Sequence, residues 1–86
     1  MLEFFSYMSP EQCRAARGWL GWTQAELAHR AGVATTTVHG FEGGYRKLTR
    51  NNVAAIRRAL ETEGIKLLFD DDGAPIGIVR DKAPDL

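Results

Sequence analysis

The polar residues in the middle of the chain offer hydrogen bonds and positive charge. Three consecutive threonines, Thr35 to Thr37, and the nearby His39 each supply single donors or acceptors, and the loop GYRKLTR that follows carries three cations. Arginine, lysine and hydroxyl side chains are the groups that contact phosphate oxygens. These residue types indicate that the chain binds an anion.

Catalysis and metal binding have no support in the residue pattern. Cys13 is the single cysteine, so it has no partner for a disulfide or a metal site, and we expect it to lie buried in a helix. His29 and His39 stand ten positions apart without a third ligand. No motif pairs a nucleophile with a base, and no phosphate loop is present. We therefore expect no enzyme activity, no metal and no cofactor.

The net charge is zero, but the charges are unevenly distributed. Residues 10–58 hold eight basic and three acidic side chains, whereas residues 59–86 hold three basic and seven acidic ones. A basic body with an acidic tail favours an anionic partner for the body. The alternative is a solvated charge pattern without a partner.

Length and composition indicate one small globular domain. The chain has 86 residues, of which 44% are apolar and 26% charged. No apolar run approaches the roughly 20 residues of a membrane span, and the opening MLEFFSYM is too short for a signal peptide. We expect a cytoplasmic protein without membrane contact. A chain of this size often gains stability by dimerising.

Two capping boxes and two glycines delimit the first two helices. The box Ser-Pro-x-Gln at residues 9–12 predicts a helix start, and Gly21 predicts its end. The box Thr-x-x-Glu at residues 23–26 predicts a second, short helix that ends at Gly32.

The next stretch, TTTVHGFEGG, has β-branched residues that favour a strand. However, Val38 and Phe41 share one face of a helix but would lie on opposite faces of a strand. We predict a short helix over residues 35–42 that is held by the packing of these two side chains. Ala34 is a weak start signal, so we expect Thr35 or a neighbour to cap the helix.

A fourth helix and a hairpin complete the chain. Thr49 or Asn51 is expected to cap a helix that runs to about Thr62. Two β-rich runs, at residues 65–69 and 76–80, then flank an Asp-rich turn with an Asp-Gly pair, which predicts a β-hairpin.

A short helix ended by glycine, a tight link and a second helix form the helix-turn-helix pattern. In this arrangement the first helix braces the DNA backbone and the second enters the major groove. The start of the first helix, Thr23-Gln24, suits phosphate oxygens. The loop after the second helix brings Tyr45, Arg46 and Lys47 to the same side.

The stretch WTQAELAHRAGVATTTVHGFEGG resembles the helix-turn-helix of the Cro and phage-repressor family, also called the xenobiotic-response-element family. The resemblance covers about residues 9–60 and implies binding to double-stranded DNA. The predicted fold is mainly α, with a four-helix repressor-like domain over residues 9–63 and a β-hairpin over 64–80, where family members often have a fifth helix. We predict an N-terminal extension or short strand over residues 1–8 and a flexible tail over 81–86.

Residue roles follow from the pattern and the resemblance together. The candidate DNA-binding residues are Thr23, Gln24, Thr35, Thr36, Thr37, His39, Gly40, Tyr45, Arg46, Lys47 and Arg50. The resemblance implies that Gln24 touches the DNA backbone and sometimes a base. It also implies an internal pair between Arg17 and Glu42, which links the first helix to the end of the third. The alternative for Gln24 is a simple polar residue at a helix end. The alternative for Arg17 and Glu42 is two solvated charges that do not pair.

The predicted recognition helix departs from the usual readers. Bidentate contacts to bases come from Arg, Asn and Gln, and residues 35–42 contain none of these. Threonine offers one hydrogen bond and a methyl group for thymine, His39 offers one bond, and Gly40 permits close approach. We expect modest specificity per half-site, with dimer symmetry and DNA shape supplying the rest.

The hairpin carries apolar residues on both faces, and an isolated two-stranded hairpin is marginal in water. We predict that it forms a dimer interface from Ile65, Leu67, Leu68, Phe69, Ile76, Ile78 and Val79. The alternative is a lid over the chain's own core.

These observations predict a sequence-specific, DNA-binding transcriptional regulator that acts as a homodimer on a two-fold operator. A regulatory protein is a further candidate partner. The competing prediction is an antitoxin-like or other protein-interaction module.

Overall fold

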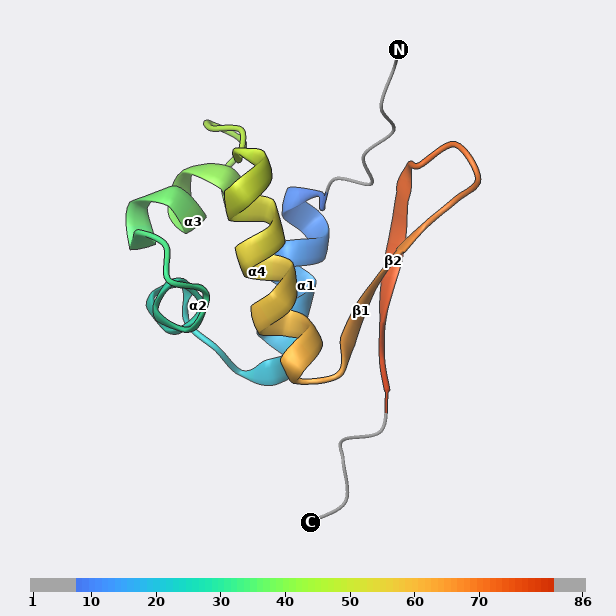
Figure 1. Cartoon of the computed structure of the whole chain (residues 1–86), viewed down its shortest axis with the longest axis horizontal. Coiled ribbons are helices and arrows are strands. Elements are labelled where there is room, and N and C mark those ends of the chain that lie inside the picture. Colours follow the sequence, from blue (N-terminus) through green and yellow to red (C-terminus); the bar gives the residue numbers. More distant parts are fainter. Residues whose placement is uncertain (1–7, 82–86) are drawn as a thin grey trace.

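Four helices precede a two-stranded antiparallel hairpin in the computed structural model, which describes residues 8–81 (Figure 1). The elements are α1 (Pro10–Leu20), α2 (Gln24–Ala31), α3 (Thr35–Glu42), α4 (Arg50–Thr62), β1 (Ile65–Phe69) and β2 (Pro75–Arg80). This confirms the mainly α fold with a C-terminal hairpin. The extension predicted over residues 1–8, apart from the buried Met8, and the tail beyond Asp81 lie outside the described residues.

Helix boundaries follow the predicted caps. The Ser9 hydroxyl accepts from the Gln12 amide N–H at 3.0 Å, while the Gln12 side chain accepts from the Ser9 N–H at 2.9 Å, which completes a capping box. The Thr49 hydroxyl accepts from the Asn52 N–H at 3.1 Å and starts α4. Gly21 ends α1 in the left-handed conformation that glycine adopts without a Cβ clash.

Residues 35–42 form a helix, α3, despite their three threonines. Its N-cap is Ala34, which makes no side-chain capping bond, so the expectation that Thr35 or a neighbour caps it is wrong. Val38 and Phe41 are 0% and 7% exposed, and they hold the helix against the core. Tertiary packing therefore stabilises a segment whose own propensity is low.

The core lies where the helices and the hairpin meet. Its largest fully buried side chains include Leu27 from α2, Val38 from α3, Ile56 and Leu60 from α4, and Ile65 from β1. Every element except β2 contributes a buried residue, so α3 and the hairpin share one apolar cluster.

Gln12 anchors the hairpin to α1. Its side-chain Nε2 donates to the backbone oxygens of Leu68 (3.0 Å) and Gly77 (2.9 Å), which are opposite residues of the ladder. The strand register shifts just beyond this pair, between Leu68 and Phe69. A buried amide thus satisfies two carbonyl groups at an irregular point of the sheet.

The hairpin is partly a cover for the core, which corrects the predicted interface. Ile65 and Leu67 are 0% and 8% exposed because β1 turns this face toward the helices, so their side chains are not available to a second chain. Phe69 and Ile78 are half-buried against the same core. The large apolar side chains of the hairpin that are exposed are Leu68, Ile76 and Val79.

The hairpin lies at the end of the molecule opposite α3, with α1 and α4 between them (Figure 1). Asp81, the first residue of the predicted tail, is held to the domain: its N–H donates to the Gly64 oxygen at 2.8 Å, and its carboxylate lies 2.8 Å from Lys66 Nζ. Contact with Asp81 raises the pKa of Lys66.

Candidate nucleic-acid interface

Helices α2 and α3 are joined by a short link and pack against each other. Gly32 ends α2 in the left-handed conformation, and the Val33 N–H donates to the Ala28 oxygen at 3.0 Å. Val38 and Phe41 then anchor the inner face of α3, which turns its polar residues outward. Of the candidate DNA-binding residues, those half-buried are Gln24, Thr37 and Gly40, and those exposed are Thr23, Thr35, Thr36, His39, Tyr45, Arg46, Lys47 and Arg50.

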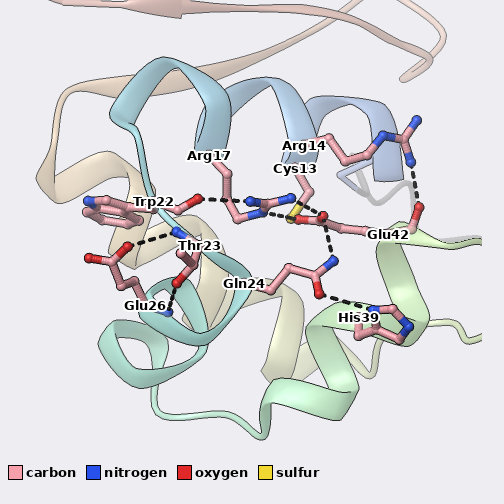
Figure 2. Close-up of polar contacts among 9 residues, drawn as sticks. All are labelled: Cys13, Arg14, Arg17, Trp22, Thr23, Gln24, Glu26, His39 and Glu42. Atoms are coloured by element: carbon pink, nitrogen blue, oxygen red, sulfur yellow. Dashed lines mark hydrogen bonds and ion pairs between the residues drawn. The ribbon is translucent and has the colours of Figure 1, made fainter.

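The start of α2 is closed by a second capping box (Figure 2). The Thr23 hydroxyl accepts from the Glu26 amide N–H at 3.0 Å, and the Glu26 carboxylate accepts from the Thr23 N–H at 2.8 Å. The first amides of a helix have no partner within the helix and suit an anion. The Glu26 carboxylate already occupies one of the amides at this end.

The loop after α3 folds back over Gly40. The amides of Tyr45 and Arg46 both donate to the Gly40 oxygen, at 2.8 and 3.2 Å. A Cβ at Gly40 would lie 3.2 Å from the Arg46 Cβ, so the small residue at this position accommodates the chain's own loop. The Arg46 guanidinium reaches within 3.4 Å of the Thr37 hydroxyl, which places a cation beside the outer face of α3.

Arg17 and Glu42 form a bidentate ion pair (Figure 2). Arg17 Nη2 lies 2.6 Å from Glu42 Oε1, and Arg17 Nε donates to Glu42 Oε2 at 2.7 Å. The Glu42 side chain is 2% exposed and that of Arg17 is 19% exposed. Arg17 also donates to the Trp22 oxygen at 2.8 Å, so the pair ties α1 to the end of α3 and to the entry of α2.

The Glu42 carboxylate is held in its ionised form. Burial alone would raise its pKa, but hydrogen bonds from Arg17, Cys13 and Gln24 outweigh burial and lower the pKa below the ordinary value. The same ion pair raises the pKa of Arg17. Burial, together with the neighbouring carboxylate, raises the pKa of the Cys13 thiol, which donates to Glu42 Oε2 at 3.0 Å.

Gln24 connects this buried group to the exposed face of α3. Its Nε2 donates to Glu42 Oε1 at 3.1 Å, and its Oε1 lies 3.1 Å from His39 Nδ1. Sequence reasoning assigned both residues to DNA but did not find their mutual contact, because it joins two residues fifteen positions apart on different helices.

Two further cations of the basic body have structural partners. Arg14 donates to the Glu42 backbone oxygen at the end of α3, a favourable place for a cation. The Arg30 guanidinium stacks 4.5 Å from the centroid of the Trp22 ring. Both side chains remain exposed and keep their charge, and Arg46 is an exposed cation beside the outward face of α3.

Within residues 8–81, no three side chains are grouped so that they could ligate a metal ion. None of the helices in this part of the chain has the length and apolar character needed to cross a bilayer.

Comparison with known protein families gives a match over most of the folded region. A family model described as helix-turn-helix matches residues 14–67, which is more than half of the chain and extends from α1 into β1. A search of curated proteins finds no match.

Proposed function

The chain belongs to the Cro/C1-type helix-turn-helix family of DNA-binding regulators, and we propose that it recognises a specific operator as a homodimer and regulates transcription there. The observation that carries this proposal is the polar outer face of α3, which the packing of Val38 and Phe41 turns to solvent and which Arg46 flanks.

In the proposed complex, α3 lies in the major groove and the start of α2 faces the sugar–phosphate backbone. Thr35, Thr36 and His39 are the exposed readers on α3. Arg46 and Lys47 extend from the loop toward phosphates on the same side, where they position the domain without reading sequence.

Each copy of α3 offers few hydrogen bonds to bases, which supports a requirement for two copies. Each threonine supplies one hydroxyl and one methyl group, the latter suited to a thymine methyl, whereas the strongest base contacts are bidentate. Two half-sites bound by a two-fold dimer add their binding energies, and DNA deformability adds further specificity.

The proposed dimer interface is the outer face of the hairpin, meeting a second copy of the chain. Leu68 and Val79 are each 39% exposed and lie on the hairpin face that points away from the core. Ile76 is 63% exposed, but it lines a hollow with the start of α1. Burial of exposed apolar side chains against a second copy would stabilise a two-stranded sheet. The hairpin lies at the end of the molecule opposite α3 (Figure 1), so pairing through the hairpin would leave the α3 helices of both copies open to DNA.

A second candidate function uses the same apolar face for a different protein, as in an antitoxin-like module. The exposed Leu68 and Val79 are the observation that favours it. Such a partner would compete with the second copy of the chain, so regulation through the oligomeric state is compatible with DNA binding by α3.

Salt-dependent DNA binding tests the proposal. DNA selected from a random pool is titrated with the protein at several salt concentrations, with fluorescence anisotropy as the readout. We expect tighter binding to selected than to scrambled DNA, and a steep loss of affinity with salt. Absence of binding at low salt would overturn the proposal.

Variants of this assay separate backbone from base contacts. Arg46→Ala should weaken binding to all sequences about equally and lower the salt slope by roughly one. Arg58→Ala is the matched control, because this exposed cation lies two turns further along α4, away from the loop. Thr36→Ala should cost about 1 kcal/mol on selected DNA and little on scrambled DNA. Equal losses on both would contradict base reading.

A further inference from the structure

A chain of hydrogen-bonded side chains runs from the interior of the domain to the outer face of α3 (Figure 2). Arg17 holds Glu42, Glu42 accepts from Gln24, and Gln24 contacts His39. Each distance is within the range of an ordinary hydrogen bond, between 2.6 and 3.1 Å. The chain therefore links a buried ion pair to an exposed candidate reader.

The hydrogen bonds converge on the Glu42 carboxylate, which accepts from Arg17 on one side and from Gln24 on the other. An ionised carboxylate only accepts hydrogen bonds, so Gln24 must present its Nε2 group to Glu42. The opposite end of the amide, the carbonyl oxygen Oε1, then faces His39. Because an amide oxygen also only accepts, His39 Nδ1 must carry the hydrogen of this contact.

The tautomer of His39 decides whether its other ring nitrogen, Nε2, donates or accepts a hydrogen bond. In a neutral imidazole one nitrogen donates and the other accepts. With the hydrogen on Nδ1, the other nitrogen, Nε2, is an acceptor. Figure 2 shows that nitrogen on the side of the ring turned away from Gln24, and the side chain is exposed.

We propose that Gln24 is a positioning residue that holds His39 as a hydrogen-bond acceptor toward DNA, so that His39 selects a base with an exocyclic amine in the major groove. Adenine N6 and cytosine N4 are the donors found there, whereas guanine and thymine present acceptors. This inference rests on the proposed function for the identity of the ligand, but the tautomer belongs to the protein alone.

The buried hydrogen bonds are what would fix the tautomer and the ring orientation of His39. A freely rotating histidine samples both tautomers and both ring orientations, and discriminates weakly between donor and acceptor bases. Here the carboxylate that orients Gln24 is itself fixed by two bonds from Arg17 and one from Cys13. The buried network thus supplies the rigidity that a reading side chain requires.

The first arm of the test needs no DNA. Long-range proton–nitrogen NMR spectra of the histidine rings, recorded at slightly alkaline pH, distinguish a proton on Nδ1, a proton on Nε2 and the doubly protonated ring. We expect His39 to carry its proton on Nδ1. His29, exposed on α2 and without a side-chain hydrogen bond in the described structure, is the internal reference.

Removing the Gln24 amide should allow His39 to adopt both tautomers. In Gln24→Met, which keeps the length of the side chain, the His39 signals should move toward those of His29, while circular dichroism shows the helical fold intact. Gln24→Leu repeats the measurement with a differently shaped replacement. A proton on Nε2 in the wild type, a doubly protonated ring, or no change in either folded variant would overturn the proposal.

The second arm measures base preference. All four base pairs are placed in turn at each position of the selected operator. One position should favour adenine or cytosine on the contacted strand, and His39→Ala should abolish that preference, with a loss of about two- to tenfold in affinity. Gln24→Met should reduce discrimination at the same position, whereas Thr36→Ala, the matched control, should act at a different position.

The outcomes separate this inference from the proposed function. If the protein binds no DNA at low salt, the proposed function fails and so does the base-selecting role, whatever tautomer the spectra show. If it binds DNA but the position that depends on His39 favours guanine or thymine, the proposed function stands and only the inference fails.

Discussion

Replacing Glu42 with alanine should destabilise the domain severely. The substitution removes a carboxylate that accepts hydrogen bonds from Arg17, Cys13 and Gln24. The Glu42 side chain is 2% exposed, so water does not substitute for it in the intact fold. Arg17 would keep its charge, 19% exposed, without its counter-ion.

The expected cost is about 3–5 kcal/mol, the range found when one partner of a buried ion pair is removed. At about 0.05–0.15 kcal/mol per residue, the free energy of unfolding of an 86-residue domain is about 4–13 kcal/mol. A loss of 3 kcal/mol should lower Tm by about 12–24 °C, at about 4–8 °C per kcal/mol for a domain of this size. Glu42→Ala would thus remove much of the stability.

Urea unfolding followed by circular dichroism measures this cost. The matched control is the double variant Arg17→Met with Glu42→Met, which replaces both charges by apolar groups. Because no unpaired buried charge remains, the double variant should recover most of the lost stability. A cost below about 1 kcal/mol for Glu42→Ala would mean that the pair behaves as an exposed one, and would refute the reasoning.

Three further substitutions test other parts of the structure. Burial raises the pKa of the Cys13 thiol, so the wild type should lose stability as the pH rises above about 8.5, the ordinary thiol value. Urea unfolding at several pH values should show a smaller loss of stability at alkaline pH for Cys13→Ala. An equal loss in the variant would contradict this role of the thiol. Gln12→Leu should cost about 1–3 kcal/mol and speed amide exchange in the hairpin, because two carbonyl groups lose their donor. Leu68→Lys should give a folded monomer in sedimentation, and a variant that remains dimeric would place the interface elsewhere.

Local signals in the sequence predicted most element boundaries. Capping boxes and terminal glycines depend on residues three or four positions apart, so the bounds of α1 and α2 could be deduced without the fold. The spacing of Val38 and Phe41 correctly favoured a helix over a strand. The hairpin followed from its turn chemistry and its β-rich runs.

Contacts between distant segments could not be deduced in this way. Gln12 was identified as a capping residue, but its bonds to the hairpin join positions 56 and 65 residues away. Alternation placed Leu68 and Val79 on one hairpin face, but the predicted interface also included Ile65 and Leu67, whose burial depends on where the helices pack. The Arg17–Glu42 pair came from the family resemblance, and its geometry bears it out.

The way α3 is held has a consequence for how its target could change. The side chains that keep it helical and seated, Val38, Phe41 and Glu42, point inward, and no capping side chain adds to them. If α3 reads DNA as proposed, a library of substitutions at Thr35 and Thr36 should change the DNA sequence that is bound with little effect on folding. His39 differs, since its ring is tied through Gln24 to the buried carboxylate, and a new residue there must suit a partner that the interior has already oriented.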